Sequence, residues 1–195
     1  MTIQEIDPRI TQTRAKALEA ALMLIRDCGI GQVTHQSVSA KSGISRSTLY
    51  RHWPEVSDLL NDAFVLVSKP PISEFVSQGS LKADLYHLLS GLVSAIQNTE
   101  WGKIVPQLIA AAAVNKGSAD LLHEFVQERL EVAEQIILAA RRRGEYNSDI
   151  TPENFLILII APVYYRFLLA GFPIDDDWIE GHVNSVSPLF KNRSR

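Results

Sequence analysis

The stretch from Thr34 to Leu60 reads THQSVSAKSGISRSTLYRHWPEVSDLL, and it decides the fold. Thr34 and Ser45 are each placed to cap a short helix, because a hydroxyl can accept a hydrogen bond from a first-turn amide. Gly43 lies between these helices, where a sharp turn can use positive φ without a Cβ clash. Pro54 suits the first position of the next helix. Two short helices joined by a glycine turn are typical of the helix-turn-helix.

The second short helix, residues 45–53, presents an outward face of hydrogen-bonding side chains. Val38, Ile44, Leu49 and Trp53 are the expected packing residues of this segment and supply a small apolar core shared with the first helix. In a helix-turn-helix the second helix enters the major groove and its N-terminal residues meet base edges. Arg46 is the best base reader, because a guanidinium can bridge O6 and N7 of guanine. The outward residues are Arg46, Ser47, Thr48, Tyr50, Arg51 and His52. The competing interpretation is a solvated surface helix with incidental arginines.

Helical periodicity continues along the chain, and no stretch shows the alternation of a convincing strand. An apolar face runs over residues 9–28, and Cys28 closes it as a small packed hydrophobe. Lys69-Pro70-Pro71 stops a later helix, because proline lacks the amide proton of the helical ladder. Further helices are predicted over residues 54–68, 80–98, 101–114, 118–143, 151–172 and 178–190, with Ser80, Thr151 and Asp175 as caps for three of them.

Composition and charge describe an ordinary globular chain of 195 residues with a net charge of −3. Residues 1–53 hold seven basic and four acidic residues, a net +3, which leaves twelve basic and eighteen acidic residues elsewhere, a net −6. A basic head on an acidic body fits phosphate binding at one end only. A single cysteine and an N-terminus without an apolar run indicate a reducing cytoplasm and no signal peptide.

At these residues the sequence resembles the TetR family of bacterial transcriptional regulators. The resemblance lies in Thr34, Val38, Ser42-Gly43-Ile44-Ser45, Thr48-Leu49-Tyr50, His52-Trp53 and Asp58-Leu59. It implies base-edge contacts for Arg46, Ser47 and Thr48, and backbone contacts mainly for Tyr50 and His52. The full set of expected DNA-binding residues is Thr34, Gln36, Ser45, Arg46, Ser47, Thr48, Tyr50, Arg51 and His52. One departure is Val56, where many members carry a phosphate-binding lysine; Arg51 or Lys41 are candidates to replace that contact.

The resemblance also implies an all-α fold in two parts. Residues 1–53 form the three-helix DNA-binding domain, and residues 54–195 form a body for effector binding and dimerisation. A helix over residues 54–68 connects the two, and residues 69–79 are the best boundary. The segment 155–172 is apolar almost all round, which suits either a membrane span or a helix buried on two sides. Pro162 and Arg166 argue against the span, so we expect a helix at the interface of a homodimer.

An effector pocket is predicted among the body helices, although core packing is the alternative at each single position. Its expected lining is Tyr86, His87, Trp101, Phe125, Tyr164, Arg166 and Phe167, with His123 as a further candidate. Arg166 has two open interpretations, an ion pair with an acid such as Glu134 or Asp120, or a contact to an anionic ligand. Arg141-Arg142-Arg143 is expected to stay solvated near the negative end of its helix.

No motif for catalysis, a metal or a cofactor is found in the sequence. The sequence therefore predicts a cytoplasmic, sequence-specific DNA-binding regulator, most simply a repressor. A small molecule would release it from a palindromic double-stranded operator. Two other interpretations remain: a DNA-binding protein controlled by a protein partner, and a ligand-binding or enzymatic helical protein in which the N-terminal motif is incidental.

Overall fold

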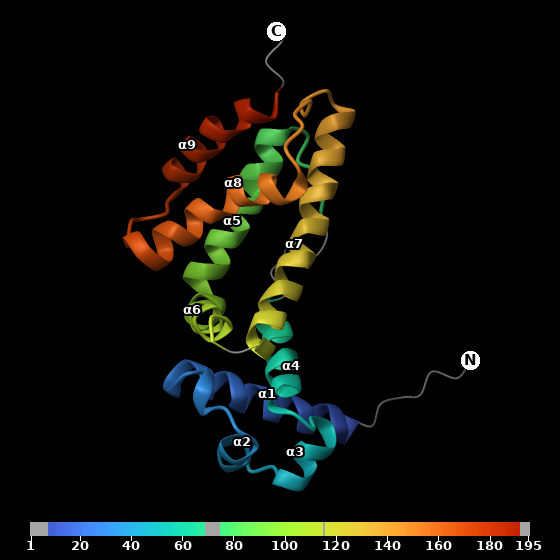
Figure 1. Cartoon of the computed structure of the whole chain (residues 1–195), viewed down its shortest axis with the longest axis vertical. Coiled ribbons are helices and arrows are strands. Elements are labelled where there is room, and N and C mark those ends of the chain that lie inside the picture. Colours follow the sequence, from blue (N-terminus) through green and yellow to red (C-terminus); the bar gives the residue numbers. More distant parts are fainter. Residues whose placement is uncertain (1–7, 69–74, 115, 192–195) are drawn as a thin grey trace, which may run out of the picture. The chain divides into compact units, whose positions relative to one another are not determined.

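The computed structural model describes residues 8–68, 75–114 and 116–191, and every element within them is helical (Figure 1). This confirms the all-α fold class. In chain order the elements are α1 (Pro8–Cys28), the 3-10 turn η1 (Ile30–Gln32), α2 (His35–Ser42), α3 (Arg46–His52), α4 (Val56–Ser68), α5 (Leu81–Asn98), α6 (Trp101–Ala112), α7 (Lys116–Arg142), α8 (Pro152–Tyr165), the π turn η2 (Arg166–Ala170), α9 (Asp176–Val186) and the 3-10 turn η3 (Ser187–Phe190). Residues 69–74 of the predicted domain boundary lie outside the described ranges.

The chain forms two compact units. The first comprises the described parts of residues 1–68 and 103–122, and the second those of 69–102 and 123–195. Helices α6 and α7 therefore each contribute residues to both units.

The first unit is built on α1, which packs against α2 and α4, while α2 packs against α3. Its small core joins the alanine-rich face of α1 to the apolar residues of the short helices. Val38 and Leu49 are fully buried and Trp53 is 2% exposed. Truncating a side chain such as Leu49 to alanine costs about 2–5 kcal/mol in a core of this kind.

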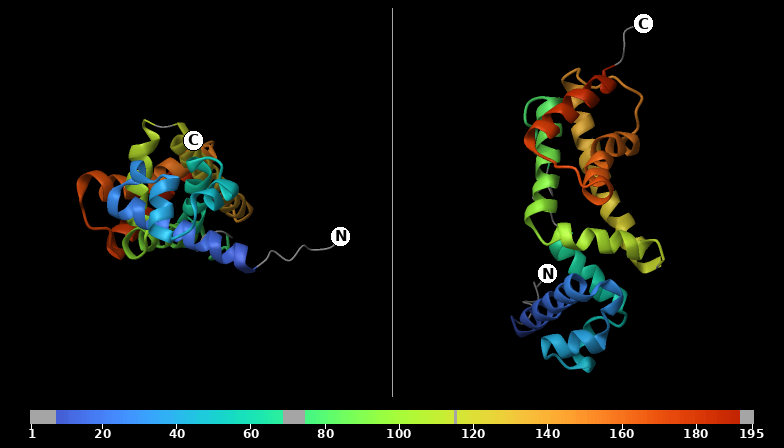
Figure 2. Two further views of the ribbon diagram at one scale, coloured as in Figure 1. Left: turned by 90° about the horizontal axis from the view of Figure 1, so that it is seen from below. Right: turned by 90° about the vertical axis from the view of Figure 1, so that its left-hand side faces the viewer.

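The second unit centres on α5, which packs against α8 and α9 (Figure 2). An aromatic cluster closes one end of this unit. Tyr146, which follows α7, stacks on Phe190 with ring centroids 5.4 Å apart, and Phe155 of α8 packs against both rings. The Tyr146 hydroxyl donates to the Ile150 carbonyl, so the buried ring keeps its hydrogen bond.

Three predicted caps of the body helices are confirmed. The side chains of Ser80, Thr151 and Asp175 accept hydrogen bonds from the amides of Ala83, Asn154 and Trp178. These bonds form between residues three apart in sequence, which is why the local sequence alone could predict them.

Several helix boundaries differ from those predicted, each for a local reason. Helix α4 begins at Val56 rather than Pro54, because the Asp58 carboxylate accepts the Glu55 amide and sets the first turn there. Helix α9 ends at Val186 and continues as a 3-10 turn, because Pro188 has no amide proton to extend the α-helical ladder. The segment predicted as one helix to residue 172 ends in the π turn η2 and a left-handed Gly171.

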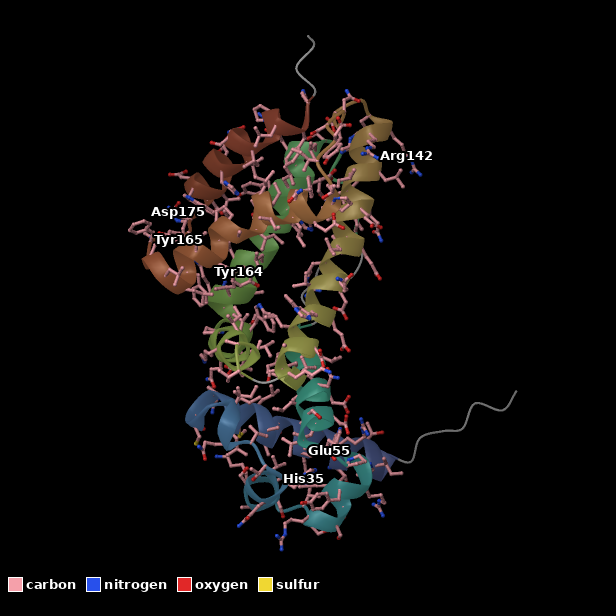
Figure 3. The ribbon with its side chains drawn as sticks, in the orientation of Figure 1. His35, Glu55, Arg142, Tyr164, Tyr165 and Asp175 are labelled. Atoms are coloured by element: carbon pink, nitrogen blue, oxygen red, sulfur yellow. The ribbon has the colours of Figure 1, made fainter. Side chains whose placement is uncertain are left out.

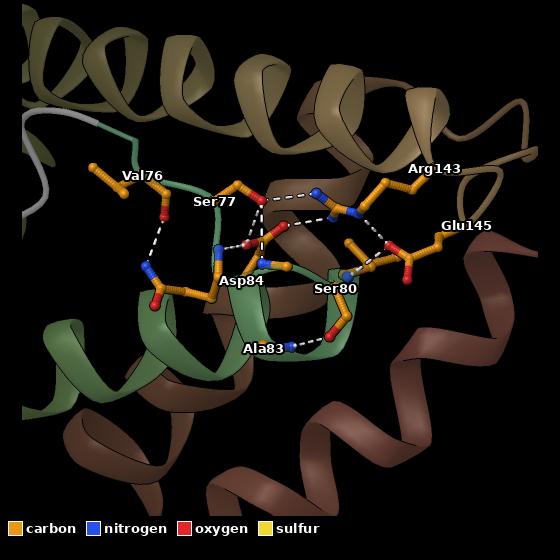
Figure 4. Close-up of polar contacts among 10 residues, drawn as sticks. Val76, Ser77, Ser80, Ala83, Asp84, Arg143 and Glu145 are labelled. Carbon is orange, nitrogen blue, oxygen red and sulfur yellow. Dashed lines mark hydrogen bonds and ion pairs between the residues drawn. The ribbon is translucent and has the colours of Figure 1, made fainter.

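Cys28 and Arg143 also differ from expectation. Cys28 is exposed rather than packed, because the buried face of α1 ends at Ile25. Arg143 is not simply solvated. It pairs with the fully buried carboxylate of Asp84, at 2.7 Å, and with Glu145, at 2.8 Å (Figure 4).

This cluster ties the start of α5 to the end of α7. Besides its two carboxylates, Arg143 donates to the Ser77 hydroxyl, and Glu145 accepts the backbone amide of Leu81. Asp84 in turn accepts the Gln78 amide. A buried carboxylate is tolerated here because a guanidinium and a backbone amide both reach it.

The cluster predicts an acid-sensitive contribution to stability. Burial tends to raise the pKa of Glu145, but the hydrogen bonds from Arg143 and from the Leu81 amide outweigh it and lower that pKa. A carboxyl whose folded pKa lies below its unfolded value, about 4.3, stabilises the fold above that value. This contribution is lost as pH falls through the folded pKa.

Glu145→Gln is therefore expected to lower the melting temperature at pH 7, and the deficit should shrink toward pH 3. Thermal unfolding followed by circular dichroism across this range measures it. Glu134→Gln, an exposed change on α7, is the matched control. A deficit that stays constant with pH would contradict the prediction.

Helix α8 and the π turn η2 that follows it leave an apolar stripe exposed on the second unit, which we call the α8 stripe. Ile157, Tyr165 and Leu169 are 60%, 59% and 77% exposed, and Ala161 lies between them at the same helical spacing. The helical stretch of residues 152–170 is long and apolar enough to cross a membrane, and only 17% of its 18-residue apolar window is buried. Length and composition alone are weak evidence for a span.

Candidate functional site

The turn between α2 and α3 is built by side chains as well as by its glycine. Gly43 adopts φ 73°, and its amide closes α2 on the Ser39 carbonyl. The Ser39 hydroxyl donates to the Ile44 carbonyl at 2.6 Å, which ties the last turn of α2 to the entry of α3. At the start of α2, Thr34 and Ser37 form a reciprocal capping box.

The N-terminus of α3 gathers three hydroxyls. Ser45 caps the helix by accepting the Thr48 amide, and its hydroxyl lies 3.0 Å from that of Ser47 and 2.9 Å from that of Thr48. Ser45, Ser47 and Arg46 are exposed, so these groups can reach a ligand in front of the helix. Such an N-terminus also favours an anion, because its first amides are unpaired.

The structure brings the expected DNA-binding residues onto one unit. Ser45 to Ser47 and Tyr50 and Arg51 are exposed, as are Thr34 and Gln36, while Thr48 and His52 are half-buried. Tyr50 is 53% exposed, and its ring stacks on that of His35 with the centroids 4.1 Å apart. The buried His35 side chain therefore helps to hold Tyr50 in position. Lys41 is exposed at the end of α2.

A chain of polar contacts holds the far end of α3. His35 is 6% exposed, and its Nε2 donates to the Trp53 carbonyl, the C-cap of α3, at 2.7 Å. The Trp53 indole N–H donates to the Asp62 carboxylate of α4, also at 2.7 Å. Arg14 of α1 pairs with the same carboxylate, and its guanidinium lies 4.8 Å from the Trp53 ring.

These contacts, which we call the Trp53 relay (Arg14, His35, Trp53 and Asp62), join α3 to α1, α2 and α4. The sequence predicts that Trp53 packs in the core, but it does not indicate the three partners that Trp53 meets there. One signal was available, because a buried indole N–H usually needs an acceptor, and Asp62 follows on the next helix. His35 is labelled in Figure 3.

His52 gives DNA binding by this unit an expected pH dependence. Burial, with the positive charges of Arg51 and Arg14, lowers the pKa of His52, so the imidazole is neutral near pH 7. A phosphate beside it would favour the protonated form and raise that pKa. Binding would then take up a proton, and affinity should rise as pH falls from about 7.5 toward 6, by at most about tenfold per pH unit.

Fluorescence anisotropy with a labelled duplex measures this slope. His52→Gln should remove most of it, whereas His123→Gln, an exposed change on α7, should leave it. Equal slopes for wild type and His52→Gln would show that His52 does not contact a phosphate.

The residues expected to line an effector pocket separate into different places in the second unit. Trp101 of α6 and Phe125 of α7 pack with ring centroids 4.7 Å apart, and Trp101 also hydrogen-bonds with Tyr164 of α8. Arg129, which the sequence analysis missed, lies over the Phe125 ring at 4.1 Å. We call these four residues the Arg129 cluster.

Tyr86 and His87 lie elsewhere, on a groove of about 610 Å³ between α5 and α9. Lys82, Glu180 and Asn184 share this groove and add polar and charged side chains to its lining. Phe167 is half-buried in η2.

Arg166 corrects one expectation. It pairs with neither Glu134 nor Asp120, but donates to the Pro173 carbonyl and lies over the rings of Phe172 and Trp178. The π turn and Gly171 fold the chain back, so that backbone nearby in sequence satisfies this guanidinium. Among the described residues, no three His, Cys, Asp or Glu side chains converge as a metal site.

Comparison with known proteins agrees with this geometry. Residues 17–63 match the model of bacterial regulatory proteins of the tetR family, and residues 76–186 match the tetracyclin repressor-like C-terminal domain. The chain is 24% identical over 175 residues to the uncharacterised HTH-type transcriptional regulator YdeS of Bacillus subtilis, covering 88% of this chain and 86% of YdeS. It is 27% identical over 178 residues to the DNA-binding transcriptional repressor TetR of Mycobacteroides abscessus, covering 90% and 92% of the two chains.

A solved structure of similar fold is that of the TetR family transcription regulator SCO0332. It superposes with a TM-score of 0.66 at 26% identity, over 91% of this chain and 98% of SCO0332. The N-terminal match, to bacterial regulatory proteins of the tetR family, covers residues 17–63 and therefore includes α2 and α3.

Proposed function

Because the chain belongs to the TetR family of bacterial transcriptional regulators, we propose that it represses transcription from a palindromic operator. A small-molecule effector would release it. The observation that carries this proposal is the exposed polar face of α3, which the Trp53 relay holds from three other helices. The M. abscessus relative is named as a repressor, which supports repression rather than activation.

The proposed division of labour follows the chain. Residues 1–53 bind DNA, residues 54–195 bind effector and dimerise, and α4 connects them. Arg46, Ser47 and Thr48 meet base edges, while Thr34, Tyr50, Arg51 and His52 contact the backbone. Phosphate contacts fix the register and base contacts read the sequence. The family consists of regulators rather than enzymes, and regulation of this kind takes place in the cytoplasm.

The exposed stripe of α8 supports a homodimer. Ile157, Ala161, Tyr165 and Leu169 form one continuous apolar face that water would otherwise cover. Monomeric proteins rarely expose such a face without a partner. A two-fold axis there would present two α3 helices, which must lie about 34–36 Å apart, or a multiple of this, to occupy both half-sites.

Release by an effector requires a difference in affinity. The effector must bind the DNA-free conformation more tightly than the DNA-bound one, because equal affinity for both would shift nothing. The Arg129 cluster is the proposed site, since it combines aromatic faces with hydrogen-bonding groups in the second unit.

The test is selection of duplexes from a random pool by the purified full-length protein. We expect an enriched palindrome whose binding weakens steeply with salt, because phosphate neutralisation releases counterions. A reporter driven by a promoter that contains this palindrome should be repressed when the protein is expressed. Absence of any sequence preference would refute the proposal, and activation of the reporter would refute repression alone.

A further inference from the structure

One face of α2 carries three polar side chains on the side that meets α3. His35, Ser39 and Ser42 follow one another at intervals of four and three residues, so they line one side of the helix. His35 and Ser42 are the first and last residues of α2. Val38 shares this face and is fully buried in the small core. Polar groups beside a buried apolar residue are normally held by hydrogen bonds, and these three are.

Each of the three side chains bonds to backbone that flanks α3. At its entry, the Ser39 hydroxyl donates to the Ile44 carbonyl at 2.6 Å, and the Ser42 hydroxyl accepts from the Ile44 amide at 3.2 Å. Ile44 lies between the two helices and belongs to neither. At the exit of α3, the buried His35 ring donates to the Trp53 carbonyl at 2.7 Å. We call these three side chains the α2 clamp, because they hold both ends of α3.

The α2 clamp adds what the apolar core of these helices cannot supply. Burial of Val38 and Leu49 stabilises the pair of helices, but apolar burial is non-directional and tolerates small rotations and shifts of α3. A hydrogen bond weakens steeply as its angle or length departs from the preferred geometry. Bonds at both ends of a helix of only seven residues therefore resist its rotation and its tilting.

Sequence reading depends on this orientation more than overall DNA affinity does. A side chain reads a base edge only when donor and acceptor are well aligned and about 2.7–3.2 Å apart. Attraction to the phosphates is electrostatic and independent of sequence, so it survives small movements of the helix. An α3 released from the clamp would thus keep non-specific DNA binding and lose discrimination.

We propose that the α2 clamp positions α3 for sequence reading, so that His35, Ser39 and Ser42 determine discrimination between operator and other DNA without contacting a base. This rests on the proposed function, because it concerns how α3 reads its operator. The base-reading residues at the start of α3 supply the contacts, and the clamp supplies their placement. Three positions outside the expected DNA-binding set thereby become determinants of specificity.

The experiment measures specific and non-specific affinity separately on the full-length protein. The probes are the operator obtained by selection and a scrambled duplex of equal length and composition, compared by fluorescence anisotropy at one salt concentration. The paired variant Ser39→Ala/Ser42→Ala should lower operator affinity by about 10- to 100-fold, comparable with one mismatched base pair. It should lower affinity for the scrambled duplex by no more than about threefold, because the phosphate contacts remain.

Single variants show whether the hydrogen bonds carry the effect. His35→Phe keeps an aromatic ring but removes the donor to the Trp53 carbonyl, so it should also reduce discrimination. Ser39→Thr keeps the hydroxyl and should retain most of the discrimination that Ser39→Ala loses. Ser185→Ala is the matched control and should change neither affinity. The Ser185 hydroxyl, like that of Ser42, donates to the carbonyl four residues earlier in its own helix.

The ratio of the two affinities distinguishes positioning from folding. Circular dichroism establishes that each variant is folded at the assay temperature. A purely structural role would lower both affinities together through the folded fraction and leave their ratio unchanged. An unchanged ratio in the paired variant and in His35→Phe would overturn the inference while specific DNA binding stands. If the paired variant does not fold, His35→Phe and Ser39→Ala decide. A wild-type protein that selects no sequence would instead refute the proposed function, and the inference with it.

Discussion

Arg46→Ala is expected to relax base discrimination at one position of each half-site by about 1–3 kcal/mol, the value of a good bidentate contact to guanine. Arg46 is the first residue of α3, is exposed, and lies in the sequence between the hydroxyl residues Ser45 and Ser47. The loss is roughly 5- to 150-fold in relative affinity for the preferred base. Binding to duplexes that vary at one position at a time measures it.

The matched control lies on the same helix. Arg51→Ala removes an exposed arginine one and a half turns further on, where a backbone contact is proposed. It should weaken all sequences about equally and reduce the salt slope by about one. If Arg46→Ala also weakened all sequences equally, Arg46 would be a phosphate contact and base reading would belong to other residues.

Ile157→Glu is expected to produce a monomer and to lower operator affinity by about 10²- to 10⁴-fold. In the dimer, binding at one half-site holds the second DNA-binding domain close to the other half-site, and the monomer loses this gain. Ile157 is 60% exposed on the α8 stripe. In a two-fold interface each residue of the stripe meets the same stripe of the partner, so the change introduces two like charges into one apolar interface. Size-exclusion chromatography with light scattering gives the mass, and titration of the full palindrome gives the affinity.

Leu138→Glu is the control, since Leu138 of α7 is a similarly exposed apolar residue, at 51%, outside the stripe. It should leave the dimer and the affinity unchanged. A dimer that survives Ile157→Glu would place the interface elsewhere. The same pair of variants also tests whether residues 152–170 span a membrane. If they do, Ile157→Glu should reduce association with the membrane instead of breaking a dimer.

Tertiary contacts between helices explain most of what the sequence analysis missed. Trp53 was correctly assigned to the core, yet its bonds to Asp62 and, through its carbonyl, to His35 depend on how α4 and α2 lie beside α3. Arg143 was expected to be solvated but pairs with Asp84, 59 residues away. Periodicity predicts which face of a helix is buried and is silent about which polar partner meets it.

In residues 54–195 the sequence was an even weaker guide to which side chains lie together. Three of the four residues of the Arg129 cluster were expected near an effector, but Tyr86 and His87 share a different groove and Arg166 is satisfied by the Pro173 carbonyl. Arg129 itself carries no motif, since an arginine on an acidic helix resembles any solvated one. Its burial becomes apparent only when α6, α7 and α8 are in place.

The sequence by itself determined the all-α class, the helix-turn-helix and the polar face of α3. It could do so because caps, glycine turns and apolar spacing act between residues at most four apart. The tertiary structure alone decided how α3 is held, where the buried guanidiniums find partners and which apolar stripe stays exposed. Those features join residues tens of positions apart, and their energies depend on burial, which no local pattern specifies.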